Sequence, residues 1–228
     1  MELRKNDPEF AERFQHFAFD EVVNEENQQL DAPTRYLAIL SALIGCGGVD
    51  AYREMLPIAL ENGMTPVMVK ETVYQATDYL GYGRMLPFLN ATNEVFADRN
   101  IPLPLPGKAT TTMENRLEKG AEAQAEIFGE QMKEAWKNGH INRWLAANCF
   151  GDYYTRKGLD LAQRELITFC FLMAQGGCEP QLIAHAKGNM HVGNDKHFLI
   201  CVVSQCLPYI GYPRSLNALE CIKKAAEK

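Results

Sequence analysis

Three side chains in the second half of the sequence have the chemistry that an enzyme would use: Glu165, Cys178 and His185. A histidine titrates near neutral pH, so it can give a proton to carbon or remove one. A thiol becomes a nucleophile once it loses its proton, which a nearby histidine favours. Glu165 could relay a proton to His185, or it could be only a favourable charge in the first turn of a helix. Cys178 follows two glycines and also fits a plain small residue at a helix start.

The segments that must position these residues occur twice. GYGRMLPFLN, from Gly81, matches GYPRSLNALE, from Gly211, at an offset of 130 residues (211 − 81). LDAPTRYLAIL, from Leu30, matches LDLAQRELITF, from Leu159, at an offset of 129 (159 − 30), and FDEVV lies against FGDYY just before. Chance matches do not keep register over so long a stretch. The chain is therefore predicted to hold two copies of one unit.

The two copies differ at the positions that could do chemistry. At the positions matched to Glu165, Cys178 and His185, the first copy has, in order, Tyr36, Gly48 and Met55. Any chemistry is therefore expected in the second copy, around Cys178 and His185. Arg35 and Arg164, in contrast, precede apolar helices in both copies, which suggests a shared structural ion pair more than catalysis.

Each copy is predicted to be helical throughout. RYLAILSALIG is apolar on all sides and rich in Ala and Leu, which is typical of a core helix. Thr65 is expected to cap the helix that begins at Pro66, and Asp195 is expected to cap the matching helix. The phrases that start at Gly81 and Gly211 are expected to be tight corners, in which the glycine takes an unusual backbone angle and the tyrosine plugs the corner.

The order of segments predicts two repeats and a linker. Residues 1–99 are expected to form the first repeat, and 100–112, rich in Pro, Gly and Thr, a linker. Residues 113–228 are expected to form the second repeat with a long leading helix. In that helix apolar residues recur at steps of three and four, which predicts one continuous stripe ending at Gly139.

Composition excludes several classes of partner and cofactor. The net charge of −6, with no basic run, disfavours nucleic acid or a membrane as a partner. No stretch approaches the length of a membrane span, and the first residues lack the apolar region of a signal peptide. The seven cysteines are an odd number and lie mostly in apolar runs, which is typical of reduced thiols in a cytoplasmic protein. No zinc-type spacing occurs, so neither a metal nor a cofactor is expected.

The sequence resembles the carboxymuconolactone decarboxylase family in a tandem-repeat form. The second copy carries the resemblance in LDLAQRELITF, HAKGNMHVG and YIGYPRSLNAL, and the first in LDAPTRYLAIL, ENGMTP and YLGYGRMLPFLN. The resemblance implies an all-α fold and one of two chemistries: cofactor-free decarboxylation of a muconolactone, or the thiol peroxidase activity of the alkylhydroperoxidase D type. Because each copy alone carries apolar helices with too little surface to hide them, the duplication predicts that the two copies pack against each other about a pseudo-two-fold axis.

The peroxidase motif of this family, CxxCxxxH, fits the second copy only in part. Counted back from Gly193, its first cysteine falls on Cys178 and its histidine on His185, but its second cysteine falls on Gln181. A two-cysteine peroxidase needs that second thiol to close a disulfide on the sulfenic acid. Cys178 would instead depend on an outside thiol, with His185 lowering the pKa of Cys178.

Decarboxylation needs different groups. The site must hold the substrate carboxylates, hydrogen-bond the lactone carbonyl and return a proton to carbon. On the resemblance, the expected catalytic residues are His185, Cys178 and Glu165, and the expected substrate-binding residues are Arg164, Arg214, Tyr209 and Tyr154.

The leading prediction is a lyase without a cofactor that acts on a small unsaturated lactone or carboxylic acid. The first alternative is a thiol-dependent peroxidase using Cys178 with His185, and the second is an oligomeric small-molecule binder without turnover. Single-copy members of the family resemble rings, often of six units. Three two-copy chains are therefore expected to form a homotrimer, which would bury helix faces that are too apolar for solvent.

Overall fold

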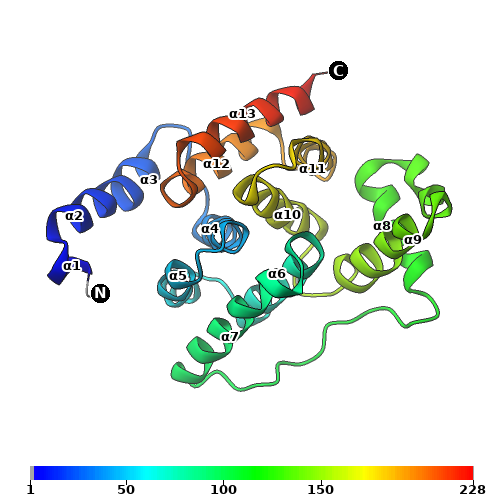
Figure 1. Cartoon of the computed structure of the whole chain (residues 1–228), viewed down its shortest axis with the longest axis horizontal. Coiled ribbons are helices and arrows are strands. Elements are labelled where there is room, and N and C mark those ends of the chain that lie inside the picture. Colours follow the sequence, from blue (N-terminus) through cyan, green and yellow to red (C-terminus); the bar gives the residue numbers. More distant parts are fainter. Residues whose placement is uncertain (1–2, 228) are drawn as a thin grey trace.

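The computed structural model describes residues 3–227, which form helices and loops with no β-strand among them (Figure 1). The first copy contains α1 (Leu3–Asn6), α2 (Pro8–His16), the π-helix η1 (Phe17–Glu21), α3 (Val22–Asn24), α4 (Ala32–Cys46), α5 (Val49–Glu61), α6 (Pro66–Leu80) and α7 (Tyr82–Asp98). An irregular connection follows, and then α8 (Arg116–Phe128), the 3₁₀-helix η2 (Glu130–Asn138), α9 (His140–Trp144), the π-helix η3 (Leu145–Tyr154), α10 (Leu161–Gln175), α11 (Glu179–His191), α12 (Lys196–Ile210) and α13 (Tyr212–Ala226). The predicted all-α fold is confirmed. No helix of the described residues is both long and apolar enough to cross a membrane.

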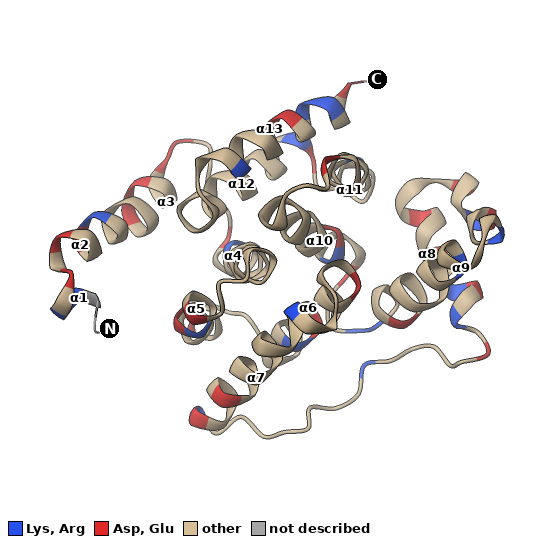
Figure 2. Cartoon of the chain, in the orientation of Figure 1, with Lys and Arg blue, Asp and Glu red and all other residues tan. Residues whose placement is uncertain are grey.

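The centre of the molecule is the pair of helices α4 and α10, which pack against each other. Both are buried along most of their length and carry few charges (Figure 2). The side chain of Asp31 caps α4 by accepting from the backbone N–H of Thr34 at 3.1 Å. The two helices approach closely at Gly45, where a Cβ atom would lie 2.8 Å from the Cβ atom of Ala174. A core helix covered on all sides was predicted from the sequence and is confirmed.

Two matched hydrogen bonds cross between the copies. The Arg35 side chain of α4 donates from Nε to Oε1 of Gln205, on α12, at 2.8 Å. The Arg164 side chain of α10 donates to Oε1 of Gln75, on α6, also at 2.8 Å. The duplication matches Arg35 with Arg164 and Gln75 with Gln205, so the same contact is made twice, each time from one copy to the other. This reciprocity is the packing about a pseudo-two-fold axis that the duplication predicted.

The predicted helix starts and corners are found, with one difference. Thr65 and Asp195 cap α6 and α12 by accepting backbone N–H bonds. Gly81 and Gly211 have φ values of 82° and 80°, in the left-handed region that favours glycine. The tyrosines that follow do not plug the corners, because each is the first residue of the next helix and points to solvent: Tyr82 is 63% exposed and Tyr212 is 60% exposed.

The segment before the second copy is not the single helix that its apolar stripe predicted. Helix α8 ends at Phe128, and Gly129 has a φ of 101°, which no α-helix contains. The chain then continues as η2, whose end at Gly139 agrees with the prediction. The stripe indicated which residues are apolar, but not that the glycine would break the helix.

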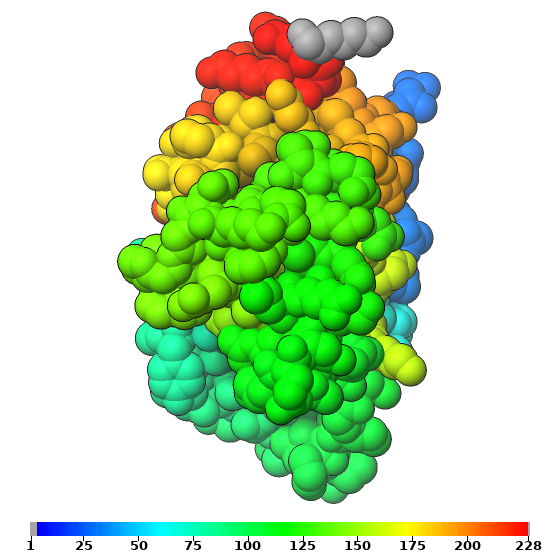
Figure 3. Space-filling view, turned by 90° about the vertical axis from the view of Figure 1, so that its right-hand side faces the viewer, coloured from blue at the N-terminus to red at the C-terminus, as the bar shows by residue number. Residues whose placement is uncertain are grey.

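Helix α8 crosses η3 with almost no space between the two backbones. A Cβ atom on Gly120 would lie 1.8 Å from the carbonyl oxygen of Ala146, and one on Gly151 would lie 2.1 Å from that of Arg116. Only glycine allows such an approach from both sides. Figure 3 shows this segment, in green, lying across one side of the molecule between the teal helices of the first copy and the yellow and orange helices of the second.

Candidate active site

A cavity of about 590 Å³ lies where α6 of the first copy meets α8, η2, η3, α10 and α11; we call it the His185 cavity. Its apolar walls are Phe128, Met132, Leu145, Phe150, Leu172 and Ala184. Its polar groups are Asp78, Tyr79, Gln124, Gln131, Gln175, Cys178, Gln181 and His185. No lysine or arginine of the described residues lines it. A mostly apolar pocket with a few converging polar groups is the usual form of a small-molecule site.

His185 is held by Glu165 and by two aromatic rings. Its Nδ1 atom lies 2.9 Å from Oε2 of Glu165, a carboxyl group with no exposed surface. The rings of Tyr79 and Phe128 meet the imidazole edge to face, with centroids 5.4 Å and 5.3 Å away. Because Nδ1 is occupied by Glu165, Nε2 is the ring nitrogen left for a ligand in the cavity. The predicted pairing of Glu165 with His185 is confirmed as geometry.

A chain of hydroxyl groups continues from Glu165. Tyr154 donates to Oε1 of Glu165 at 2.9 Å, and its oxygen lies 2.8 Å from the hydroxyl of Tyr79 and 2.7 Å from that of Thr168. Burial raises the pKa of both tyrosines well above the ordinary value, so both remain hydrogen-bond donors at neutral pH. Tyr154 was predicted to bind substrate directly, but it lies behind the lining residues and positions Glu165 and Tyr79.

Asp78 is an acid that the sequence reasoning missed. It lines the cavity, and its Oδ2 atom is buried with no hydrogen-bond partner in residues 3–227. Burial raises the pKa of Asp78 to about 8, and the charge of Asp152 adds to this, while a hydrogen bond to Cys149 lowers it. The group is therefore mostly neutral at pH 7 and can donate a proton. A signal did exist: the duplication matches Asp78 with Pro208, the same kind of asymmetry that singled out Glu165.

Cys178 lies in the cavity wall but is not activated. Its thiol donates to the carbonyl oxygen of Leu172 at 3.4 Å, and the amide of Gln175 donates to the sulfur at 3.6 Å. Burial raises the pKa of Cys178 above its ordinary value, so it is a thiol at neutral pH. All seven cysteines are free. The position of the motif's second cysteine, Gln181, also borders the cavity.

Arg164 is a structural residue and not part of the cavity. Its guanidinium is fully buried, pairs with Glu71 at 3.0 Å and donates to the carbonyl oxygen of Arg156 at 2.8 Å, besides its bond to Gln75. The prediction that it binds substrate is wrong, because Arg164 is not among the residues that line the cavity and both of its Nη atoms are bonded to other residues. The expected ion pair is present for Arg164 alone, since its counterpart Arg35 has no carboxylate partner in residues 3–227.

Tyr209 and Arg214 also lie elsewhere. Tyr209, on α12, packs edge to face against Phe14 of the first copy, and burial raises the pKa of Tyr209 to about 12. The tyrosine that lines the His185 cavity is instead Tyr79, which the duplication matches with Tyr209. It reaches the cavity because packing about the pseudo-two-fold axis places α6 of the first copy beside the second copy's site. Arg214 lines a different cleft, at the end of α4. The site is thus shared between the copies, and the prediction that it belongs to the second copy alone is wrong in this respect.

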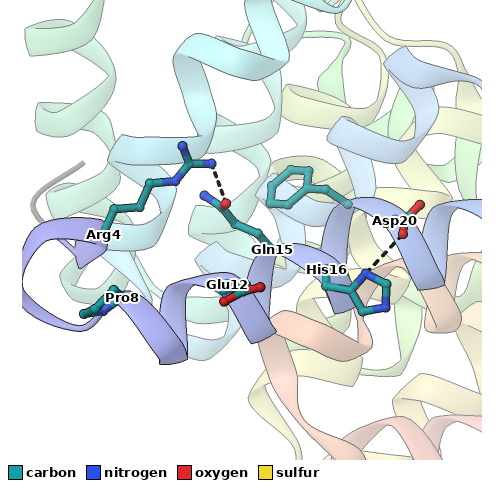
Figure 4. Close-up of a pocket in the computed structure, with 7 residues that line it drawn as sticks. Arg4, Pro8, Glu12, Gln15, His16 and Asp20 are labelled. Atoms are coloured by element: carbon teal, nitrogen blue, oxygen red, sulfur yellow. Dashed lines mark hydrogen bonds and ion pairs between the residues drawn. The ribbon is translucent and has the colours of Figure 1, made fainter.

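The first copy has no enclosed counterpart of the cavity. The register that aligns FDEVV with FGDYY matches Asp20 with Gly151 and Gln15 with Ala146, the residues that α8 crosses in the second copy. In the first copy these side chains line an open groove on α1, α2 and η1, where His16 lies 3.1 Å from Asp20 in an exposed pair (Figure 4). An aspartate at the matched position leaves no room for a close crossing. The groove is therefore the bare face that α8 covers in the second copy.

Comparison with known proteins places the chain in a family. The model of the carboxymuconolactone decarboxylase family matches twice, over residues 8–94 and 140–224. The two matches cover most of the chain and agree with the two structural copies, so the protein belongs to this family. A search of curated proteins finds no match. Helices α8 and η2, which contribute Gln124, Phe128, Gln131 and Met132 to the cavity, lie between the two matched segments.

Proposed function

We propose that the His185 cavity catalyses decarboxylation, or a closely related lyase reaction, on a small unsaturated lactone or carboxylic acid. The observation that carries this proposal is the presence of two acid–base systems in one largely apolar cavity. His185 is oriented by Glu165, and Asp78 is a neutral acid at pH 7. Enzymes that transfer protons commonly place two titratable groups beside one substrate and use their different environments to give the two groups different roles as acid and base.

The proposed reaction divides the work between the two systems. The bond between the ring carbon and its carboxylate breaks, carbon dioxide leaves, and the electron pair passes into the conjugated carbonyl as an enolate. The O–H of Asp78 hydrogen-bonds the enolate oxygen and stabilises its charge. His185, protonated at Nε2, then gives that proton to carbon and restores the carbonyl. Glu165 accepts the N–H of Nδ1 throughout and stabilises the charged imidazole.

The cavity also limits the kind of substrate. With no lysine or arginine among the described residues that line it, the cavity offers a carboxylate only His185 and neutral donors: the hydroxyl of Tyr79, the protonated Asp78 and the N–H groups of the side-chain amides. Several carboxylates on one substrate would lose hydration without a matching cation. We therefore expect a substrate with one carboxylate and an apolar body.

The test uses a panel of small unsaturated lactones and conjugated acids, each with one carboxylate, in heavy water. Carbon dioxide release and deuterium at the product carbon are measured together by mass spectrometry and NMR. Turnover of a panel member that is lost in His185→Asn supports the proposal. Equal release by wild type and His185→Asn, or no release from any member, would overturn it.

Thiol peroxidase activity is a second candidate because Cys178 and His185 border the same cavity. The raised pKa of Cys178 and the glutamine at the motif's second cysteine position both weigh against it. Consumption of an organic hydroperoxide with an added dithiol, in wild type and Cys178→Ser, distinguishes the two. Peroxide consumption that requires Cys178 would favour the peroxidase over the lyase.

A further inference from the structure

A second cleft, of about 350 Å³, lies on the pseudo-two-fold axis, at the adjoining ends of α4 and α10. Two pairs of matched residues line it: Arg84 with Arg214, and Cys46 with Gln175. When both members of a duplicated pair line one cleft, the axis that relates them passes through it. The repeated phrase Gly-Tyr-x-Arg therefore delivers two arginines to a single place.

The two arginines have no negative charge to face. Among residues 3–227, no aspartate or glutamate lines the cleft. The Arg84 side chain makes one hydrogen bond, to Oε1 of Gln175 at 3.2 Å, and Arg214 makes neither a side-chain hydrogen bond nor an ion pair with any of residues 3–227. Neither arginine caps a helix end. Near the ends of α4 and α10, backbone N–H groups donate to carbonyl oxygens instead: Gly48 donates to Leu43, and Gly176 donates to Leu172.

The position of the two arginines in their helices raises the electrostatic free energy of holding both cations in the cleft. Arg84 and Arg214 lie in the first turns of α7 and α13, next to the positive end of each helix dipole, where a cation is unfavourable. Neither first turn contains an acidic residue that would offset it. Two guanidinium groups and two helix N-termini thus concentrate positive charge at one cleft, although the protein as a whole is negatively charged.

We propose that this cleft binds a small dicarboxylate, with one carboxylate on each guanidinium. The two-fold related arginines match a ligand with two equivalent anionic ends, and each end can accept two parallel N–H bonds from its arginine. Val49, Pro87 and Phe88 give the cleft an apolar surface that suits the hydrocarbon between the two carboxylates. The site is separate from the His185 cavity, with which it shares only Gln175, and it does not depend on the reaction proposed there.

Isothermal titration calorimetry with succinate and adipate tests the proposal, with acetate and inorganic phosphate as comparison ligands. The variants are Arg84→Gln and Arg214→Gln, and Arg143→Gln serves as the control. Arg143 is exposed on α9, makes no side-chain bond to residues 3–227, and loses the same charge. Circular dichroism and thermal unfolding verify that each variant is folded, as expected for side chains at the surface.

Wild type and Arg143→Gln are expected to bind at least one dicarboxylate alike, and each cleft variant is expected to bind it about tenfold or more weakly, because one charged hydrogen-bonded end is lost. Acetate and phosphate are expected to bind more weakly than the dicarboxylate. Three results would overturn the proposal: no dicarboxylate binding by wild type, equal binding by the cleft variants, or phosphate or acetate binding as tight as that of the dicarboxylate.

Discussion

Asp78 is a carboxyl group that the His185 cavity holds in its neutral form. Its pKa of about 8 arises mainly from burial, to which the charge of Asp152 adds. An unfolded chain would lose this proton near the ordinary pKa of 3.8. Between these two values the folded protein binds more protons than the unfolded one. Stability is therefore full at low pH and falls as the pH rises through this window.

Asp78→Asn should remove this pH dependence. At pH 8 the variant is expected to be more stable than wild type by about 1 kcal/mol or more, and near pH 4 the two should be similar. Urea unfolding at a series of pH values measures the difference. Asp98→Asn, an exposed aspartate on α7, is the control and should follow wild type. A wild-type stability that stays flat between pH 4 and pH 8 would show that Asp78 is charged.

Glu165 should matter for turnover because it orients His185. Glu165→Gln keeps the shape of the side chain but replaces one of the two carboxylate oxygens with an NH₂ group. Tyr154 and His185 each bond one of those oxygens, so one of the two hydrogen bonds loses its acceptor. We expect turnover to fall by about a hundredfold. Tyr36→Phe, at the matched position of the first copy, should change turnover by less than about twofold. Steady-state rates on a substrate found with the panel compare the two, and equal losses would contradict a single site.

The sequence was sufficient to single out His185 and Glu165, because the first copy has Met55 and Tyr36 at the matched positions. It was not sufficient to find Asp78 and Tyr79. These two lie on α6 of the first copy, and only the packing of the two copies brings them to His185. Arg164 shows the opposite error: its residue type suited a carboxylate, but its buried contacts with Glu71 and Gln75 occupy it.

At the scale of elements, α8 encloses the His185 cavity. It closes one wall of that cavity, whereas among residues 3–227 the matching face of the first copy is the open groove on α1, α2 and η1. The apolar stripe predicted one helix up to Gly139, whereas α8 ends at Phe128, and the stripe did not predict the contact with η3. Sequence periodicity reports which face is apolar, whereas the glycines that allow a crossing leave no such pattern.

Gly120→Ala should disrupt this crossing. The added methyl group would overlap the carbonyl oxygen of Ala146, so the helices must separate, and we expect a loss of about 3 kcal/mol in the free energy of unfolding. Gly83→Ala, in α7, has nothing within 4 Å of the new Cβ atom and should stabilise by about 0.5 kcal/mol. Chemical denaturation measures both. A Gly120→Ala protein as stable as wild type would mean that α8 does not sit against η3 in this way.

At the scale of the whole molecule, the exchanged Arg–Gln contacts make the two copies one folding unit, as the duplication predicted. Apolar side chains still remain at the surface, among them Ile141 and Trp144 on α9, which are 63% and 54% exposed. We expect three chains to assemble into a ring that covers such residues. Light scattering should then give three times the mass of one chain, and a stable monomer at micromolar concentration would rule the ring out.

The most direct test of the composite site is the pH dependence of turnover, measured on a substrate found with the panel. Wild type should lose activity above about pH 8, as Asp78 loses its proton. Asp78→Asn should be slower and lack this alkaline limb, and His185→Ala should be inactive, whereas Met55→Ala should affect mainly stability. An Asp78→Asn enzyme with the wild-type rate and profile, or equal losses of activity in His185→Ala and Met55→Ala, would contradict an acid–base site shared between the two copies.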